Sequence, residues 1–423
     1  MNKTKVFLAG DTANRLNWGC RATTLALKSM IMDTSDISYS LDFSKLAKSL
    51  NTINTTNNHS FSRRVLNKIS NKVYNFTGIT VEKRQKLNIH PTNIEEFDFF
   101  ADQFQKRAFL PSIYDQIDNS DVVVINGEGG FLKSEKTFPA LMSLFIGYVA
   151  KRCLKKPCII INHTADIRHP EIKAIAQYVY PLFDDVAVRE PFSFRAIKDL
   201  RKNKPVILAA DAVFKYKPIT NNSWAEVVSR PHYFSFYPFS VQNLDVSKPY
   251  ICLGGSAALH PMRRKDHKPF PAFLKLCKAL NDIYPVVLVA ACAGDEDFMR
   301  EVSKELNLPV LGTSMPTYQA VDVLGNAALY VGGRWHSCIK ALTGGTPIVV
   351  FSSNTNYKSE GIVELMKLDH NPFDSYHIGE FVEDIVEQSE DYLKQGSSLR
   401  ERLLRRVQEL SDSADKNVRF LWT

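Results

Sequence analysis

Short apolar runs alternate with amphipathic helical patterns along the whole chain. In the first half these runs cover residues 6–10, 122–126, 158–161, 186–188 and 206–209. Unbroken apolar runs rich in β-branched residues are typical of strands that are buried on both faces of a parallel sheet. Because helical patterns separate these runs, the first half is predicted to consist of βαβ units.

The second half repeats this pattern. Its apolar runs cover residues 250–255, 286–290, 309–311, 329–331 and 348–351. Between two of these runs, residues 295–306 place Phe298, Met299, Val302 and Leu306 at helical spacing. The sequence therefore predicts an α/β fold of two Rossmann-like domains that face a cleft.

The change from the first set of strands to the second falls between residues 214 and 246, where three prolines interrupt the periodic pattern. We predict a first domain over 1–225 and a second domain over 226–397. Residues 398–401 read Ser-Leu-Arg-Glu, a capping-box pattern that predicts a terminal helix over 398–423. By analogy with two-domain transferases, this helix is expected to cross back onto the first domain.

Residues 44–118 do not follow the βαβ pattern and are predicted to form a basic helical insertion. Within it, residues 62–76 place Val65, Ile69 and Val73 on one helical face, with basic side chains around the rest. A helix of this kind could rest on an anionic membrane surface or bind an acidic acceptor. The simpler interpretation is a surface helix that packs on the sheet and leaves its basic face in water.

Charge and cysteine content narrow the class of protein. The 423 residues include 53 lysines and arginines against 45 acidic residues, a formal net charge of +8, which favours anionic partners. No zinc-finger spacing, helix-turn-helix or basic–aromatic motif accompanies this charge, so nucleic acid is not expected as a partner. The seven cysteines are dispersed, which predicts reduced thiols, no metal site and a cytoplasmic location.

Targeting and membrane-spanning signals are weak. The first apolar run is too short for the core of a signal peptide. The longest apolar stretch, residues 138–150, contains a proline and is too short to cross a bilayer. A peripheral contact with the inner face of the membrane is compatible with the basic excess.

Residues 331–337, which read Val-Gly-Gly-Arg-Trp-His-Ser, carry the strongest chemical signal. They place Arg334 and His336 where a predicted strand ends and a helix begins, the edge at which open α/β sheets bind ligands. A helix N-terminus and a guanidinium both suit an anion. An imidazole with an ordinary pKa of about 6.5 can transfer a proton at neutral pH. We therefore predict an enzyme for a phosphorylated or carboxylated substrate, with Arg334 and His336 as catalytic residues.

The sequence lacks the motifs of two other enzyme classes, the P-loop nucleotide-binding enzymes and the serine hydrolases. The glycine-rich residues 127–130 are not followed by Lys-Ser or Lys-Thr at the P-loop spacing, and no Gly-x-Ser-x-Gly elbow of a serine hydrolase is present. The loop at 127–130 could let the backbone approach a sugar, or it could be only a tight turn that requires glycine.

These motifs, in their order along the chain, resemble the polysaccharide pyruvyl transferase family. The matching segments are residues 17–19, 127–132, 185–190 with Ser193, Asp211, 333–336, 345–349 and 357–361. The sequence departs from the family pattern at several positions. Trp335 replaces the usual leucine, Glu128 adds an acid to the glycine-rich loop, Cys20 stands where an aspartate commonly follows the glycine, and Ala328 stands where members often carry an aspartate.

The resemblance implies a GT-B-like fold, phosphoenolpyruvate as donor, a sugar acceptor and no tightly bound cofactor. Transfer of a pyruvyl group as a ketal requires protonation of the enol ether, attack by two sugar hydroxyls and departure of phosphate. An anion with a carboxylate and a phosphate needs at least two cationic contacts. The residues assigned to donor binding are Arg189, Arg334, Lys358 and Ser337. For Arg189 and Lys358, a surface salt bridge and a solvated loop position are the non-functional alternatives.

The resemblance also implies that the acceptor binds to the first domain and the donor to the second. The residues assigned to the acceptor are Asn17, Trp18, Glu128, Gly129 and His163. Trp18 could stack on a sugar face or belong to the core, and Glu128 could bind or deprotonate a hydroxyl. The acceptor itself would be a sugar or a lipid-linked oligosaccharide of a surface polysaccharide.

Two further functions stay open at this point. The first keeps the fold but uses a nucleotide-activated sugar as donor, as a GT-B glycosyltransferase in polysaccharide biosynthesis. The second is a non-catalytic glycan-binding subunit, against which the Arg334–His336 pair argues. The sequence gives no indication of the oligomeric state.

Overall fold

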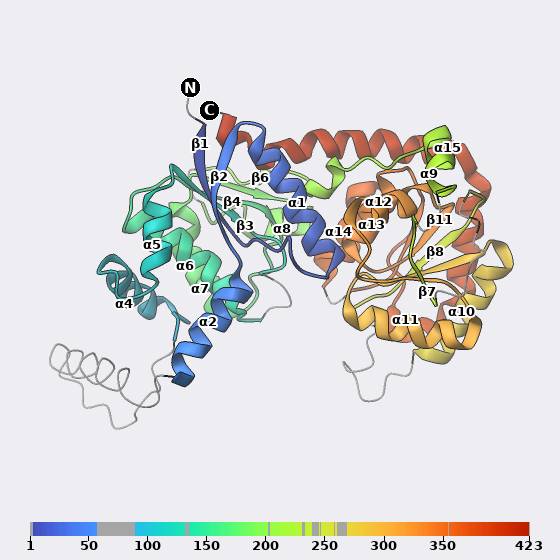
Figure 1. Cartoon of the computed structure of the whole chain (residues 1–423), viewed down its shortest axis with the longest axis horizontal. Coiled ribbons are helices and arrows are strands. Elements are labelled where there is room, and N and C mark those ends of the chain that lie inside the picture. The colour runs from blue at the N-terminus through green and yellow to red at the C-terminus, as the bar shows by residue number, and fades with distance from the viewer. Residues whose placement is uncertain are drawn as a thin grey trace.

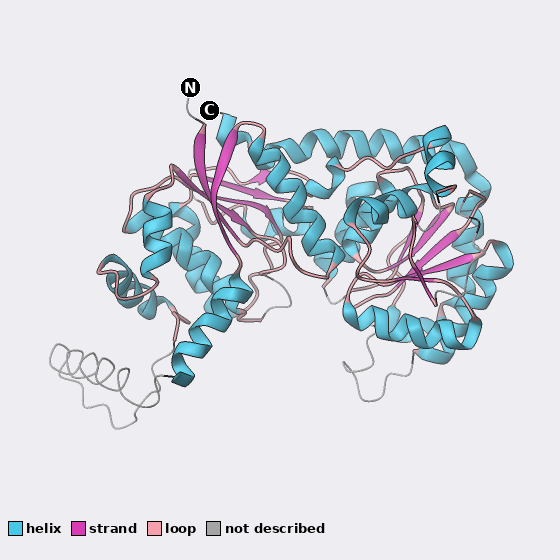
Figure 2. Cartoon of the chain, in the orientation of Figure 1, coloured by secondary structure: helices cyan, strands magenta, loops and turns pink. Residues whose placement is uncertain are grey.

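A computed structural model describes residues 3–56, 89–131, 135–201, 204–230, 233–238, 245, 247–257, 259, 269–353 and 355–422. The chain forms two α/β units, each built on its own six-stranded sheet (Figures 1 and 2). The basic helix that we predict over 62–76 lies outside the described residues.

The sheet of the first domain is parallel throughout, in the order β2-β1-β3-β4-β5-β6. Its strands are β1 (Thr4–Ala9), β2 (Ser35–Leu41), β3 (Val122–Asn126), β4 (Cys158–His163), β5 (Asp185–Val188) and β6 (Ile207–Leu208). The chain leaves β1 toward β2 and later returns to the other side of β1 at β3. The strand order therefore reverses between β1 and β3, and the carboxyl ends of these strands are where open α/β sheets generally bind ligands.

Helices cover both faces of this sheet because alternate side chains of each strand are apolar and buried. Val6 and Leu8 of β1 pack in the core of one face with α1, whereas Phe7 and Ala9 pack in the core of the other face. The helices are α1 (Trp18–Met32), α2 (Phe43–Thr56), α4 (Ile94–Gln105), α5 (Pro111–Asp118), α6 (Phe138–Arg152), α7 (Pro170–Val179) and α8 (Pro191–Ile197), with the short 3-10 turn η2 (Tyr180–Leu182) after α7.

The second sheet has the order β12-β11-β8-β9-β10-β7, with only β7 antiparallel. Its strands are β7 (Phe236–Tyr237), β8 (Ile251–Gly254), β9 (Val286–Val289), β10 (Val310–Leu311), β11 (Leu329–Gly332) and β12 (Ile348–Val350). The order reverses between β8 and β11, so the carboxyl end of β11, which leads to Arg334 and His336, lies at the second ligand-binding edge.

The helices of the second domain begin in the segment that joins the two sheets. They are the 3-10 turn η3 (Ala212–Lys215), α9 (Asn221–Val228), α10 (Phe270–Ile283), α11 (Ala293–Leu306), α12 (Thr317–Asn326), α13 (Trp335–Leu342), α14 (Asn356–Met366) and the 3-10 turn η5 (Ser375–Glu380). A single apolar core joins α1 of the first domain to the second sheet. This core fixes α1 and α13 against one another.

The last long helix, α15 (Val382–Ala414), is kinked at Gly396, which has a positive φ of 55°. The backbone of Gly396 is not helical, so α15 consists of two helices, and the capping-box pattern at 398–401 lies in the first turn of the second one. After α15 come the turns η6 (Asp415–Asn417) and η7 (Arg419–Trp422) on the first domain. There Asn417 accepts the backbone N–H of Asn162 at 2.8 Å, and Arg419 pairs with Asp185 at 2.8 Å.

None of the described helices combines the length and apolarity that a membrane span requires. The seven cysteines are free thiols. Within the described part of the chain, no group of histidine, cysteine and acidic side chains is arranged to hold a metal ion.

Candidate active site

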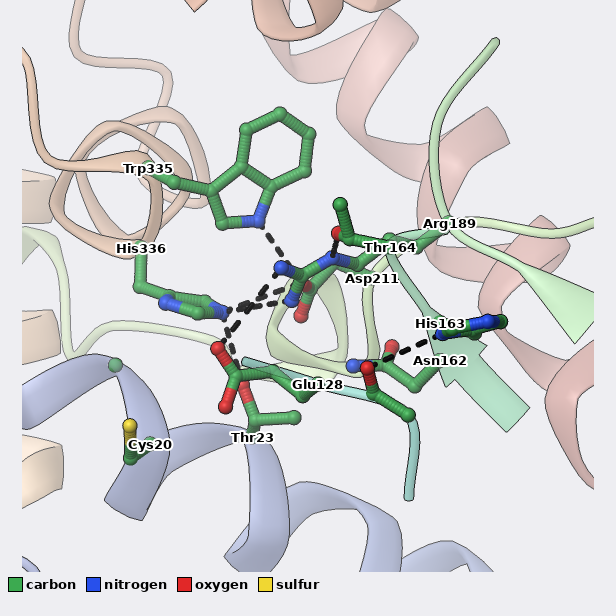
Figure 3. Close-up of polar contacts among 12 residues, drawn as sticks. Cys20, Thr23, Glu128, Asn162, His163, Thr164, Arg189, Asp211, Trp335 and His336 are labelled. Carbon is green, nitrogen blue, oxygen red and sulfur yellow. Dashed lines mark hydrogen bonds and ion pairs between the residues drawn. The ribbon is translucent and has the colours of Figure 1, made fainter. Parts of the chain in front are cut away.

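Charged side chains from both domains meet where the carboxyl ends of the two sheets face one another. Figure 3 shows the Arg189 guanidinium and the His336 imidazole pointing toward one another, with the Trp335 indole and the Glu128 carboxylate on either side. Arg189 follows β5 and Glu128 follows β3, whereas Trp335 and His336 form the first turn of α13. We call Glu128, Arg189, Asp211, Trp335 and His336 the interdomain cluster.

Asp211 lies at the centre of this cluster and caps η3. Its Oδ2 accepts hydrogen bonds from Arg189 Nη1 at 2.6 Å and from Trp335 Nε1 at 2.9 Å, and lies 3.2 Å from His336 Nε2. Its Oδ1 accepts the backbone N–H of Val213 at 2.9 Å. Burial opposes the charge, but the neighbouring Arg189 and His336 outweigh it and hold the pKa of Asp211 far below its usual range. One carboxylate therefore links the first domain to the start of α13.

Arg189 is fully buried, and only some of its guanidinium N–H groups have hydrogen-bond partners. Its Nε donates to Thr164 Oγ1 at 2.8 Å, and its guanidinium lies 5.3 Å from the ring centre of Trp335. Its Nη2 has no hydrogen-bond partner among the described residues, and Glu128 Oε1 is 3.9 Å away. A buried donor without a partner is costly, so this nitrogen is suited to a ligand oxygen.

His336 presents one ring nitrogen to the cluster. Its Nε2 lies 2.9 Å from Thr23 Oγ1 and 3.2 Å from Arg189 Nη1. Burial lowers its pKa, although Asp211 acts in the opposite direction, so the imidazole is neutral at pH 7 and able to accept a proton. The other side of the ring packs on Gly19, where an added Cβ would overlap Nδ1. Glycine at position 19 is therefore what allows α1 to approach His336.

Glu128 and Lys358 reach the cluster from opposite domains. Glu128 Oε2 is buried and has no hydrogen-bond partner within the part of the chain that the structure describes. Burial favours its neutral form, but its neighbours His336, Arg189 and Lys358 favour the carboxylate and lower its pKa. Lys358, in the first turn of α14, has its pKa lowered by burial to about 8, and Glu128 opposes this shift.

Arg334 stands apart from the cluster. Its Nε donates to Asp295 Oδ2 at 2.9 Å, its Nη2 donates to Asp295 Oδ1 at 2.5 Å, and Nη2 also lies 3.1 Å from Cys292 Sγ. Asp295 lies in the first turn of α11 and binds this guanidinium through both carboxylate oxygens. The guanidinium that we expected to be free for the donor is bound to a carboxylate. Ser337, the fourth donor-binding candidate, is 1% exposed inside α13.

The acceptor-binding candidates divide into two groups. Gly129 lies beside open space, with a positive φ of 70°, so its backbone is accessible to a ligand. Asn17 uses its Oδ1 to cap α1, accepting the N–H groups of Gly19 at 2.9 Å and Cys20 at 3.1 Å. These two residues and Glu128 lie near the site, although the Asn17 oxygen is already engaged.

Trp18 and His163 lie in the core instead. Trp18 is 1% exposed, and the Lys340 ammonium lies 5.0 Å from its ring centre, so the ring offers no free face to a sugar. His163 is fully buried, with Nδ1 3.2 Å from the Gly127 carbonyl oxygen and Nε2 bonded to the Tyr180 hydroxyl. Burial lowers the pKa of His163 to about 3. The prediction that Trp18 and His163 line the acceptor site is corrected by their burial.

The structure adds residues that we did not assign to the site. Asp211 follows a predicted strand, and this position at the sheet edge is a signal that could have identified it. Thr23 and Thr164 carry no such signal, because threonine is common in helices and loops. Trp335 shows why the departure from the usual leucine matters: its indole N–H binds Asp211, and a leucine cannot donate this bond.

The sequence of the chain matches that of one known protein family. A sequence model of the polysaccharide pyruvyl transferases matches residues 33–355, about three quarters of the chain. The chain belongs to the polysaccharide pyruvyl transferase family. It is therefore a transferase of polysaccharide biosynthesis, as the motifs predicted. No curated protein sequence matches it.

Solved structures confirm the predicted GT-B-like fold of this pyruvyl transferase family member. The α,α-trehalose 6-phosphate synthase of Burkholderia multivorans superimposes with a TM-score of 0.56 at 10% identity, covering 100% of this chain and 98% of that one. The UDP-GlcNAc 2-epimerase of Methanocaldococcus jannaschii gives a TM-score of 0.51 at 10% identity, with 99% of each chain covered. Identities this low indicate a shared architecture alone.

Proposed function

We propose that this family member transfers the pyruvyl group of phosphoenolpyruvate to two hydroxyls of a sugar in a surface-polysaccharide precursor and forms a ketal. One observation carries the proposal. In the interdomain cluster, the unpartnered Arg189 Nη2 lies beside the His336 imidazole, whose Nε2 is 3.2 Å from Arg189 Nη1. A guanidinium N–H that can bind an anion and an imidazole that can transfer a proton are thus adjacent in a buried site, where electrostatic contacts are strong.

The donor would be held by cations from both domains. Arg189 offers Nη2, and Lys358 makes no ion pair with any described residue. Arg334 contributes only if the donor shares its guanidinium with Asp295, since its Nε and Nη2 are both engaged. Neither a metal nor a tightly bound cofactor is part of this proposal.

His336 would serve as the base for an attacking hydroxyl. Its neutral imidazole can take the proton, and a positioned group of this kind contributes about 10²–10⁴-fold to the rate. The accessible backbone at Gly129 would approach the sugar. The acceptor would be a free sugar or a lipid-linked oligosaccharide at the cytoplasmic face of the membrane.

A release assay tests the donor. The purified protein is incubated with candidate acceptors and either phosphoenolpyruvate or nucleotide sugars, and phosphate and nucleotide release are measured. Phosphate release together with a ketal methyl signal in the product spectrum is the expected result. Nucleotide release would instead identify a GT-B glycosyltransferase, and binding of a glycan without any release would identify a non-catalytic subunit.

A further inference from the structure

Each cation of the site is paired with a carboxylate or stabilised by the charge of one. Arg189 pairs with Asp211 at 2.6 Å, and Arg334 pairs with Asp295 at 2.5 Å. Lys358 makes no ion pair with a described residue, but its charge and that of Glu128 stabilise one another. The site is therefore close to neutral before any ligand binds, although a donor such as phosphoenolpyruvate brings several negative charges.

Of these carboxylates, Glu128 accepts the fewest hydrogen bonds from the described residues. Its side chain is 3% exposed, its Oε1 is 3.9 Å from Arg189 Nη2, and its Oε2 has no hydrogen-bond partner among the described residues. Asp211 and Asp295, in contrast, each accept several hydrogen bonds. A buried carboxyl group with a free oxygen can hold a proton there without breaking an existing bond.

We propose that Glu128 takes up a proton when the anionic donor binds and then delivers this proton to the methylene carbon of the donor. This inference rests on the function proposed above, because it names the acid that the reaction of phosphoenolpyruvate requires. The acid is supplied by a residue that the family pattern does not include at this position.

The proton uptake follows from the groups that face Glu128. They are His336 on α13, Arg189 after β5, Lys358 on α14, Asp211 before η3 and Cys20 on α1. In the empty site the cations outweigh burial and keep the carboxylate charged. An anion that pairs with Arg189 and Lys358 removes this support and adds repulsion. Burial then dominates and raises the pKa of Glu128, so the carboxyl group becomes neutral.

The proton transfers balance over one turnover. The Glu128 carboxyl proton passes to the methylene carbon, whose double-bond electrons form the new C–H bond. The first sugar hydroxyl attacks the central carbon and gives its proton to His336 Nε2. The C–O bond to phosphate breaks, and His336 returns this proton to the departing phosphate. The second hydroxyl closes the ketal, and its proton restores Glu128.

Calorimetric titration with phosphoenolpyruvate tests the uptake. Binding is measured at one pH in two buffers of different ionisation enthalpy, which gives the number of protons taken up. The full-length protein is expected to take up about one proton per donor. Glu128→Gln, which removes the charge at nearly constant shape, is expected to take up none and to bind the donor as tightly or more tightly.

Phosphate release then separates a chemical role from a structural one. Glu128→Gln should lower the rate of phosphate release about 10²–10⁴-fold, whereas Glu128→Asp, which keeps a carboxyl group, should recover part of the rate. Glu383→Gln is the matched control, because Glu383 lies on the surface of the second domain, in an exposed ion pair with Lys275. Tighter donor binding combined with slower release cannot come from misfolding.

Two results would overturn the inference in different ways. If the unaltered protein binds and turns over phosphoenolpyruvate but Glu128→Gln keeps both the proton uptake and the rate, another group is the acid and the proposed function stands. If the unaltered protein neither binds phosphoenolpyruvate nor releases phosphate from it, the proposed function fails, and the role of Glu128 fails with it.

Discussion

Arg189 and Arg334 follow strands of the two sheets, yet their surroundings differ. Arg189 is fully buried, contacts Asp211 through one nitrogen and leaves another without a partner. The Arg334 side chain is 21% exposed, and Asp295 binds two of its nitrogens. A position at the carboxyl end of a strand therefore brings a cation to the site, but its partners decide whether that cation is free for a ligand.

The largest expected effect is the loss of turnover when His336, the neighbour of the buried Arg189, is replaced. His336→Ala removes the neutral imidazole beside Arg189 and should lower kcat about 10²–10⁴-fold with a smaller change in donor affinity. Arg334→Ala should have a smaller effect on kcat, because Asp295 already binds two nitrogens of its guanidinium. Steady-state phosphate release at varied donor concentration measures both. Normal turnover in His336→Ala would remove the imidazole from the mechanism.

Loss of either arginine should also destabilise the fold, to different extents. Arg189→Ala leaves the fully buried Asp211 without its main partner, which costs about 3–5 kcal/mol of unfolding free energy. Arg334→Ala should cost about 1.5–3 kcal/mol, in the range of a hydrogen bond to a charged group, because its site is partly solvated. Urea unfolding of both variants tests the order, and equal losses would contradict the difference in burial.

The pH dependence of donor capture tests the third cation. Lys358 has a pKa of about 8 in the free protein, so it is charged below this pH and neutral above it. If it binds the donor, kcat/KM for the donor should fall above pH 8, by up to about tenfold per pH unit. Lys358→Met should have a lower kcat/KM without this decline. A decline that persists in Lys358→Met would assign it to another group.

The smallest expected effect concerns Trp335. Trp335→Leu restores the residue usual in the family and removes one hydrogen bond to Asp211, which should cost about 0.5–1.5 kcal/mol of stability. Thermal unfolding measures this loss. Trp335→Phe, which keeps an aromatic ring over Arg189 but cannot donate the bond, separates the hydrogen bond from the packing. An unchanged melting temperature in both variants would show that Asp211 is held by its other partners.

The buried strands could be predicted because their apolar runs follow directly from burial on both faces. The strands β2 and β7 escaped prediction for a related reason. Ser35–Leu41 is polar and lies at the sheet edge, and Phe236–Tyr237 has only two residues. The helix candidate 295–306 corresponds to α11. Its amphipathic spacing can be recognised in the local sequence, whichever elements the helix packs against.

The site was only partly predictable. Sequence position brings Arg189, His336 and Glu128 to the facing sheet edges, and the structure places these three together. Pairings between residues far apart in the chain, such as Asp211 with Trp335 or Asp295 with Arg334, leave no local pattern. Neither does the burial of Trp18 and His163, because a strand end can face the core as well as the cleft.

Both ends of the described chain lie on the first domain, since the segment after α15 returns there (Figure 1). The second domain is consequently suspended by two tethers, the link through η3 and α9 and the helix that bends at Gly396. The apolar core between α1 and the second sheet adds a third, non-covalent connection between the two domains. Together with the shared apolar core, the two tethers hold His336 on the second domain within 3.2 Å of Asp211 on the first.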